Sequence, residues 1–489
     1  MNNEKILVFI VVLVGLIPFR TEQISAQDSN LSNSDAIQPY HENPWYWEYH
    51  GEPILLRGGS DDDNLFQWTG DRLINHLDSL ESVGGNYVRN TMSDRDEGSV
   101  YAPKEIEDGM YDLNQWNEEY WDRLEFFLEE TQKRGIIVQL TLWDWFDLSG
   151  LSDHPYNPEN NINWPEGTIE DREDFYGGSI YENKKAVLEY QRRFIDKLLS
   201  ITLDYDHILY NINNESTIGA EWENYWAKYL NDAASSQDRN IHITSMQLLP
   251  GNSVRHVMTN RDLYSFVEVS QNNQNAAGTV GYKHYENLLH WRNMINAQQE
   301  GPMPMNNVKV YGVGVGENTA AGTEQEAIER FWRNIFAGSA SARFHRPGGG
   351  RWGLGLTEKA QRTITAASMF LDEFDVFNAK PYEGCETIGN SIRADYCLAN
   401  VGKEYAVYFP DGRSTVAVDP WVYMEEVTVK WLNLTSGEWE KEETIALDWK
   451  EVPWVGPDRV LVISPGSGVG GPEDGYGNGD AFIGIIEAK

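Results

Sequence analysis

Short apolar runs alternate with longer amphipathic segments along most of the chain. The run 136–143 (IIVQLTLW) is almost unbroken, which is typical of a strand that is buried on both faces of a sheet. The segments between such runs carry apolar residues at the spacing of an amphipathic helix. This pattern predicts strands over 53–58, 86–90, 136–143, 207–212, 241–248, 265–269, 308–315 and 340–344. It predicts helices over 71–83, 114–134, 186–201, 220–233, 282–298, 324–336 and 358–374, and a short crossover over 254–262.

The order of these elements predicts the fold class. Eight strand-then-crossover units in succession indicate parallel strands that are covered on both faces. An open doubly wound sheet is the alternative, but such a sheet usually carries a glycine-rich phosphate turn after its first strand. The segment 58–62 (GGSDD) is acidic and lacks that spacing. We therefore expect an α/β fold with a (β/α)8 TIM barrel over residues 43–378.

The amino-acid composition changes after the predicted barrel. Residues 385–465 are rich in Val, Tyr, Trp and Thr and contain turn pairs such as Ser436-Gly437, which predicts a small antiparallel β-sandwich over 379–466. The segment 467–489 is glycine-rich and acidic, and we expect it to be loosely ordered.

The N-terminus predicts export. Lys5 precedes an apolar run over 6–17, and a small-residue cleavage site ends at Ala26, so residues 1–26 are interpreted as a signal peptide. A membrane anchor is the alternative, but a spanning helix needs about 20 apolar residues. The polar segment 27–42 is expected to be a flexible leader. We expect a secreted or periplasmic monomer without a membrane span.

The net charge excludes two classes of partner. Acidic residues outnumber basic ones by 76 to 39, which gives a formal charge of −37. Such a surface repels nucleic acid and anionic membranes, so neither is an expected partner.

The chain has two cysteines, Cys385 and Cys397, which lie close together in the sequence. A close pair in an exported protein is more often a disulfide than a metal site or a nucleophile. We therefore predict an intrachain disulfide, with two buried free thiols as the alternative.

Two carboxylates follow predicted strands on opposite sides of the barrel. The fourth strand runs into 213–215 (NNE) and the seventh into 316–318 (GEN), where TIM barrels carry their catalytic residues. Cleavage of a glycosidic bond needs one carboxyl to protonate the leaving oxygen and another to attack or to activate water. We expect Glu215 and Glu317 to form this pair. A separation of about 5 to 5.5 Å would indicate retention of configuration, and roughly 6.5 Å or more would indicate inversion.

Other polar clusters have simpler interpretations. Glu268 on the sixth strand is predicted to be a buried partner for an arginine rather than a third site carboxylate. The run 61–64 (DDDN) lacks the glycine and terminal glutamate of an EF-hand loop and is predicted to be a solvated loop. No clustered Cys/His pattern suggests a catalytic metal, and no Gly-x-Ser-x-Gly elbow marks a serine nucleophile. We expect neither a metal nor a cofactor.

With these residues the chain resembles clan A of the glycoside hydrolases, which are retaining enzymes on (β/α)8 barrels. That clan carries an Asn-Glu pair after the fourth strand, with the Glu as acid/base, and a Glu after the seventh strand as nucleophile. Asn214 and Glu215 match the first motif, and Glu317 matches the second. Arg89, after the second strand, resembles an arginine that the clan places near its nucleophile. The fourth strand ends Asn-Asn-Glu-Ser here, whereas Asn-Glu-Pro is common in the clan.

Shorter motifs give a closer resemblance. The segments 50–53 (HGEP), 408–413 (YFPDGR) and 431–439 (WLNLTSGEW) are similar to those of apiosidase-like hydrolases that join such a barrel to a collagen-binding-type sandwich. The resemblance implies the domain pair, and it transfers neither a substrate nor collagen binding.

Three tryptophans at strand ends are candidates for substrate binding. Trp143 and Trp145 end the third predicted strand, and Trp352 follows the eighth. Flat aromatic rings offer apolar faces on which sugar rings stack. Packing in the core is the alternative for each of them.

A positive cluster lies at the eighth strand. The window 330–357 contains no Asp or Glu, and it holds Arg343, His345, Arg346 and Arg351. Arginine pairs well with carboxylate or sulfate oxygens, which predicts a substrate with uronate or sulfate groups. The alternative is that these residues pair with acidic loops and help to keep Glu317 ionised.

These observations together predict a retaining glycoside hydrolase that cleaves a plant- or algal-type polysaccharide or oligosaccharide. An inverting hydrolase with the same two carboxylates is one alternative. A non-catalytic carbohydrate-binding protein on a barrel scaffold is the other.

Overall fold

The computed structural model describes residues 35–178, 180, 184–248, 251–271, 282–313, 322–388, 396–410, 414–419, 425–446, 461–463 and 481–488. The predicted signal peptide and Glu317 lie outside the described residues.

Eight strands form a closed ring. They are β4 (Leu56–Gly59), β5 (Tyr87–Thr91), β8 (Ile137–Asp144), β9 (Ile208–Ser216), β10 (His242–Gln247), β11 (Val267–Glu268), β12 (Met305–Asn306) and β13 (Ser341–Phe344). Strands β5, β8, β9 and β10 pair in parallel, as do β11 with β12 and β13 with β4. Backbone hydrogen bonds close the three other seams, from Asn86 to Arg57, from Ser265 to Ile243 and from Ala340 to Met305. The predicted (β/α)8 TIM barrel is confirmed.

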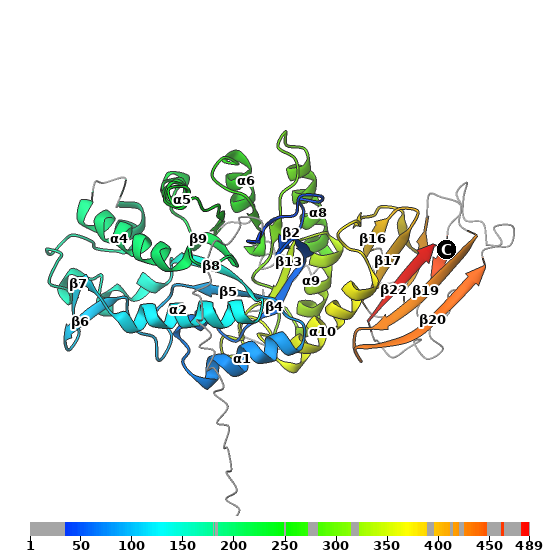
Figure 1. Ribbon diagram of the computed structural model, residues 1–489, viewed down its shortest axis with the longest axis horizontal. Coiled ribbons are helices and arrows are strands. Elements are labelled where there is room, and N and C mark those ends of the chain that lie inside the picture. Colours follow the sequence, from blue (N-terminus) through cyan, green and yellow to red (C-terminus); the bar gives the residue numbers. More distant parts are fainter. Residues whose placement is uncertain are drawn as a thin grey trace, which may run out of the picture.

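Helices cover the outside of this ring (Figure 1). They are α1 (Asp71–Ser82), α2 (Glu118–Lys133), α4 (Lys185–Thr202), α5 (Ala220–Ser235), α6 (Asn252–Thr259), α8 (Tyr282–Asn296), α9 (Glu324–Phe336) and α10 (Glu358–Glu373). Short helical turns lie at η1 (Leu65–Gln67), η2 (Asp147–Asp153), η3 (Pro158–Asn160) and η4 (Asp174–Gly178). Helix α4 shows why these segments are helical, because its buried residues recur at the spacing of one helix face: Val187, Tyr190, Gln191, Phe194, Ile195, Leu198, Leu199 and Thr202.

An N-terminal sheet, not expected from the sequence, packs against the barrel. It consists of β1 (Gln38–Pro39), β2 (Trp47–Tyr49) and β3 (Glu52–Ile54). The fully buried Trp47 donates a hydrogen bond to Asn306 at 2.9 Å. Residues 35–42, predicted as the end of a flexible leader, are therefore a structured part of the barrel.

Two other elements differ from the predicted ones. A hairpin of β6 (Pro103–Glu107) and β7 (Met110–Trp116) occupies the start of the predicted helix 114–134. The seventh strand, β12, ends at Asn306, and of the predicted strand 308–315 the described residues 308–313 contain an isolated bridge from Val310 to Phe344. There the regular ladder is interrupted, because the Asn307 amide donates to Ser341 Oγ and the Lys309 amide donates to Asn307 Oδ1.

The C-terminal domain is the predicted antiparallel sandwich. One sheet has the order β14 (Lys380–Pro381), β16 (Tyr396–Asn400), β17 (Glu404–Phe409), β22 (Phe482–Ala488), β19 (Glu426–Asn433) and β20 (Glu438–Ala446). The other has the order β15 (Cys385–Ile388), β18 (Thr415–Val418) and β21 (Leu461–Ile463). Strand β22 lies inside the larger sheet, so the end of the segment that we expected to be loosely ordered is a buried strand.

The two domains share one apolar core. The rings of Trp332 and Phe336 on α9 pack against Tyr408 on β17 at centroid distances of 6.2 and 5.7 Å. Tyr285 on α8 meets Tyr396 on β16 in an edge contact. The sandwich is thereby fixed against α8 and α9 (Figure 1).

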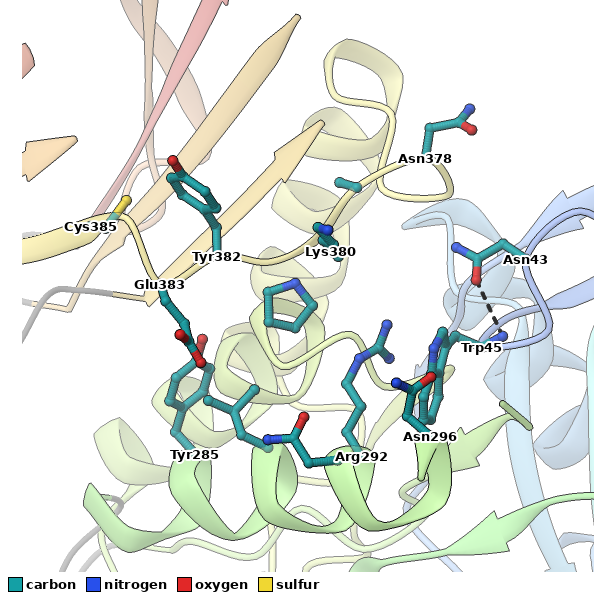
Figure 2. A pocket seen from close by; sticks show the side chains of 14 residues that line it. Asn43, Trp45, Tyr285, Arg292, Asn296, Asn378, Lys380, Tyr382, Glu383 and Cys385 are labelled. Carbon is teal, nitrogen blue, oxygen red and sulfur yellow. Dashed lines mark hydrogen bonds between the residues drawn. The ribbon is translucent and has the colours of Figure 1, made fainter. Parts of the chain in front are cut away.

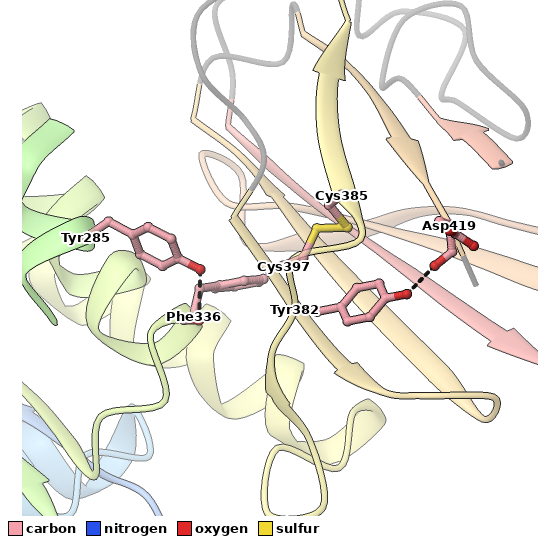
Figure 3. Close-up of a disulfide and its surroundings, with 6 residues drawn as sticks. All are labelled: Tyr285, Phe336, Tyr382, Cys385, Cys397 and Asp419. Carbon is pink, nitrogen blue, oxygen red and sulfur yellow. Dashed lines mark hydrogen bonds between the residues drawn. A yellow bond between two sulfur atoms is a disulfide. The ribbon is translucent and has the colours of Figure 1, made fainter. Parts of the chain in front are cut away.

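The predicted disulfide between Cys385 and Cys397 is confirmed (Figure 3). It joins β15 of the smaller sheet to β16 of the larger one, so it crosslinks the two layers. A crosslink that closes so short a loop contributes about 3 kcal/mol in the chain-entropy model.

Within the described part of the chain, none of the helices has both the length and the apolarity needed to cross a lipid bilayer.

Candidate active site

The end of β9 carries a local irregularity that points two neighbouring side chains the same way. Glu215 has φ 60°, a left-handed conformation that is uncommon for a residue other than glycine. The pairing of β9 with β10 shifts register at this point. In a regular strand Asn214 and Glu215 would face opposite sides, and the bulge allows both to line one cavity.

The residue before this pair is anchored on the other side of the strand. Asn213 donates a hydrogen bond to Glu223 on α5 at 2.6 Å, and Gln247 donates another at 2.8 Å. Burial raises the pKa of Glu223 to about 7, although these hydrogen bonds act in the opposite direction. Glu223 was not among the predicted site residues, and its signal is an acidic residue on the buried face of a helix that directly follows the site.

Glu215 is bound by an ammonium group and an amide. Lys309 Nζ forms an ion pair with Glu215 Oε1, and Gln271 Nε2 donates to the same oxygen at 2.8 Å. Burial favours the neutral acid, yet the pKa of Glu215 lies below its usual value because Lys309, Gln271 and Arg89 favour the carboxylate. Glu215 is therefore ionised in this state.

Asn214 is held at both ends of its amide. Its Nδ2 donates to Asp144 Oδ1 at 2.9 Å, and its Oδ1 accepts a hydrogen bond from Lys309 Nζ at 2.7 Å. Asp144 in turn forms an ion pair with Arg95. This chain of contacts fixes the orientation of the amide, with the nitrogen toward Asp144.

Asp63, which follows β4, is the centre of a buried charge cluster. Its carboxylate lies 3.3 Å from Arg89, 3.4 Å from Arg343, 3.5 Å from His345 and 3.2 Å from Arg346. Burial opposes ionisation, but the neighbouring His345, Arg89 and Arg343 side chains hold the pKa of Asp63 well below its usual value. Burial also lowers the pKa of His345 to about 4, so its imidazole is neutral near pH 7. The prediction of a solvated loop over 61–64 is wrong for Asp63, which is 3% exposed, because it is the counterion of three arginines.

We expect Asp63→Asn to destabilise the protein by about 3–5 kcal/mol at pH 7, because it leaves several buried cations without their counterion. The pKa of Asp63 is lower in the folded protein than in the unfolded one, so its ionised carboxylate stabilises the fold above about pH 4. This stabilisation is lost as the pH falls through the pKa of the folded state. The measurement is urea unfolding of both proteins at pH 7 and at pH values down to the acid transition. The exposed Asp122→Asn is the matched control for loss of one charge. Equal stability of wild type and Asp63→Asn at pH 7 would contradict the assigned role.

These groups surround one cavity of about 320 Å³ at the carboxyl ends of the barrel strands. Its lining consists of Asp63, Arg89, Arg95, Phe146, Asn214, Glu215, Leu248, Lys309, Tyr311, His345, Arg346 and Trp352.

Solved glycoside hydrolases share this architecture. A glycoside hydrolase family 5 protein from Bacteroides vulgatus is 15% identical, with 93% of this chain and 94% of that one covered and a TM-score of 0.62. A second glycoside hydrolase is 16% identical, with coverage of 93% and 97% and a TM-score of 0.62. A family 5 mannosidase from Rhizomucor miehei is 13% identical, covers 71% of this chain and 99% of its own, and has a TM-score of 0.50. At these identities the likeness shows the fold. No family model and no curated protein matches the sequence.

The structure brings together most of the predicted site residues. Arg89, Asn214, Glu215, His345, Arg346 and Trp352 all line the cavity. Arg343 is not part of the lining; it is fully buried and donates to the Val308 carbonyl at 2.6 Å and to Ser60. Arg351 is exposed on the turn that precedes Trp352 and is not part of the lining.

Two of the three predicted tryptophans do not line the cavity. Trp143 is 4% exposed and packs against Phe194 and Trp226, between the barrel and its helices. Trp145 is equally buried, and the guanidinium of Arg172 lies over its ring at 4.3 Å. Both tryptophans therefore pack in the core, as the alternative interpretation expects. A ring at a strand end can point outward to the helices as well as inward to the cavity.

Glu268 also has a different partner from the predicted one. It accepts hydrogen bonds from Gln139 at 3.0 Å and from the Ser270 amide at 2.8 Å, and the described residues place no arginine against it. Burial raises its pKa.

A larger groove of about 550 Å³ lies where α8 faces the segment 378–385 (Figure 2). Trp45 and Arg292 form one wall, with the guanidinium 3.8 Å from the ring centre. Among the described residues that line it, Glu383 is the only acidic one. Hydrolysis of a glycosidic bond by two carboxyl groups therefore has no support in this groove.

Proposed function

We propose that this protein is a retaining glycoside hydrolase, with Glu215 as acid/base and Glu317 as nucleophile. The observation that carries the proposal is the bulge at the end of β9, which turns Asn214 and Glu215 together into a cavity at the catalytic face of a TIM barrel. The likeness in fold to glycoside hydrolases supports the same reaction class. The closer relation to apiosidase-like hydrolases stays a prediction from the sequence motifs.

Arg89 supports the placement of Glu317. Its guanidinium is fully buried and faces Asp63, and within the described residues none of its N–H groups makes a hydrogen bond. A buried charged donor without an acceptor is costly, so a further acceptor beside Arg89 is expected. Glu317 follows Tyr311, which lines the same cavity, by six residues, and such a segment can span roughly 20 Å.

The reaction would proceed by double displacement. Glu317 attacks the anomeric carbon while Glu215 donates a proton to the leaving oxygen, which gives a glycosyl-enzyme. Glu215 then takes a proton from water, and that water releases the sugar with retained configuration. Asn214, held by Asp144 and Lys309, offers its amide to a substrate hydroxyl. An inverting hydrolase is the alternative, and a carboxyl separation of roughly 6.5 Å or more would favour it.

The substrate is proposed to be a polysaccharide or oligosaccharide of plant or algal type that carries uronate or sulfate groups. Three of the four residues in the predicted positive cluster contact Asp63, so pairing with an acidic loop accounts for much of that cluster. What supports an anionic substrate is the lining itself, where Arg95, Lys309 and Arg346 face the cavity. Such a cleft attracts anions more strongly at low salt. Secretion or export to the periplasm would bring the enzyme to this substrate, and the disulfide fits an oxidising compartment.

We expect hydrolysis of anionic oligosaccharides at a kcat/KM at least about tenfold above that of neutral ones with the same linkage, and a smaller ratio at high salt. The measurement is reducing-sugar release from a panel of uronates, sulfated glycans and neutral glycans, with mannan among the neutral ones. Arg95→Met should raise KM for the anionic substrates about tenfold, while the exposed Arg351→Ala changes it little. A preference for neutral sugars that Arg95→Met does not alter would exclude an anionic substrate. No release from any glycan would exclude the proposed activity.

A further inference from the structure

Lys309 contacts Glu215 and Asn214, two residues that act on the substrate in the proposed mechanism. Its side chain is 2% exposed and that of Glu215 is 8% exposed, so their ion pair is buried. The same ammonium donates to Asn214 Oδ1 at 2.7 Å. The ammonium group of Lys309 therefore binds both a carboxylate oxygen of Glu215, the proposed acid, and the amide oxygen of Asn214.

This arrangement conflicts with the first step of the reaction. A general acid has to carry its proton when the leaving oxygen departs. The ammonium of Lys309 lies on the carboxylate, and with Gln271 it keeps the pKa of Glu215 low despite burial. Lys309 must leave Glu215 before that residue can act as an acid.

We propose that Lys309 is a positioning residue operated by the substrate: a carboxylate or sulfate group of the bound glycan takes the ammonium from Glu215 and thereby allows Glu215 to be protonated. As the ion pair breaks, Glu215 takes up a proton from a hydronium ion or buffer acid of the bulk solvent, and it later passes this proton to the leaving oxygen. The inference rests on the proposed function, and it explains how an anionic group could raise turnover as well as affinity.

The other cations of the cavity are less suited to this exchange. Arg95 is held by Asp144 and Asp147, and Arg346 by three aspartates that follow β4 and β5: Asp62, Asp63 and Asp96. If a substrate anion drew Arg95 or Arg346 away from these aspartates, Lys309 would still bind Glu215, and Glu215 would stay ionised. Lys309 differs because its partner is the proposed acid itself. In the part of the chain that the structure describes, the remaining charged or titratable groups that face the pair are Arg89, Asp63, Glu268, Tyr311 and His345.

The pH profiles of two substrates with the same scissile linkage, one neutral and one carrying a uronate, test the proposal. The basic limb of kcat/KM reports the free enzyme and that of kcat reports the complex. For wild type we expect a common kcat/KM limb, and a kcat limb at higher pH for the uronate than for the neutral substrate. In Lys309→Met both limbs should move to higher pH and coincide for the two substrates, and KM for the uronate should rise about tenfold. Lys309→Arg should retain the wild-type pattern.

Arg95→Met is the matched control, because it removes a cation from the same cavity without touching Glu215. It should weaken uronate binding and leave the basic limbs in place. A Lys309→Met enzyme that loses activity equally on both substrates, with unchanged limbs, would overturn the proposal and leave Lys309 with a structural role.

A measurement without turnover separates this inference from the proposed activity. In a Glu317→Gln background with ¹³C-labelled glutamate, the Glu215 carboxyl signal is titrated with and without a galacturonate oligosaccharide, and Glu215→Gln assigns the signal. The uronate should raise the midpoint, a neutral oligosaccharide should not, and Lys309→Met should have a raised midpoint without ligand. An unchanged midpoint with bound uronate would refute the switch, whereas failure of wild type to hydrolyse any glycan would refute the proposed function alone.

Discussion

Replacing Glu317 with alanine is expected to lower kcat by on the order of 10⁵-fold, because the proposed glycosyl-enzyme cannot form without its nucleophile. The residual rate should recover in part when azide is added together with an aryl glycoside that has a good leaving group. Azide is small and anionic, so it can enter the space that the carboxylate vacates and attack the anomeric carbon from the same side. The product is then a glycosyl azide of inverted configuration.

The stereochemistry of this product makes the test specific. Glu300→Ala, an exposed acidic residue between α8 and β12, is the control for loss of one negative charge and should keep wild-type turnover. An active Glu317→Ala enzyme would remove Glu317 from the mechanism. Inactivity without azide rescue, together with inversion in the wild-type reaction, would favour the inverting alternative.

The fold could be predicted because its signals are local and repeated. Eight apolar runs and the helices between them predict the barrel, and the paired cysteines predict the crosslink of the sandwich. The N-terminal sheet was missed because its strands are two or three residues long, too short for a period to show. Strand β22 was missed because its apolar residues follow a long glycine-rich segment that dominates the composition there.

The part of the candidate site that could be predicted lies in the second half of a strand or in the segment that follows it. Arg89, Asn214 and Glu215 lie in such strands, His345, Arg346 and Trp352 follow the eighth strand, and all six line the cavity. Lys309 was missed, although a single lysine inside the apolar run 308–313 (VKVYGV) is a signal for a side chain that points into a barrel. Asp63 was missed because an acidic loop has the same sequence whether it faces solvent or three arginines. Such partners come from distant strands, and only the closed barrel brings them together.

Replacing Glu215 with glutamine is expected to lower kcat/KM on natural glycans by about 10²–10⁴-fold, because an amide cannot protonate the leaving oxygen. Glutamine keeps the shape of the side chain, and its oxygen can still accept the hydrogen bond from Gln271. Glu268→Gln is the matched control, because Glu268 is also a buried carboxyl of the barrel wall, and a raised pKa makes its neutral form similar to glutamine. It should leave hydrolysis within a few-fold of wild type.

The leaving group identifies the role of Glu215. An aryl glycoside whose phenolate needs no protonation should form the glycosyl-enzyme nearly as fast in Glu215→Gln as in wild type, so the loss of rate should fall mainly on the second step. Azide should then accelerate that step, because it needs no general base, and it should give a glycosyl azide of retained configuration. This outcome is opposite to the one expected for Glu317→Ala, so the two variants together assign the two carboxylates. Equal losses for Glu215→Gln on natural and activated substrates, without an effect of azide, would show that Glu215 supports the structure of the cavity and does not transfer the proton.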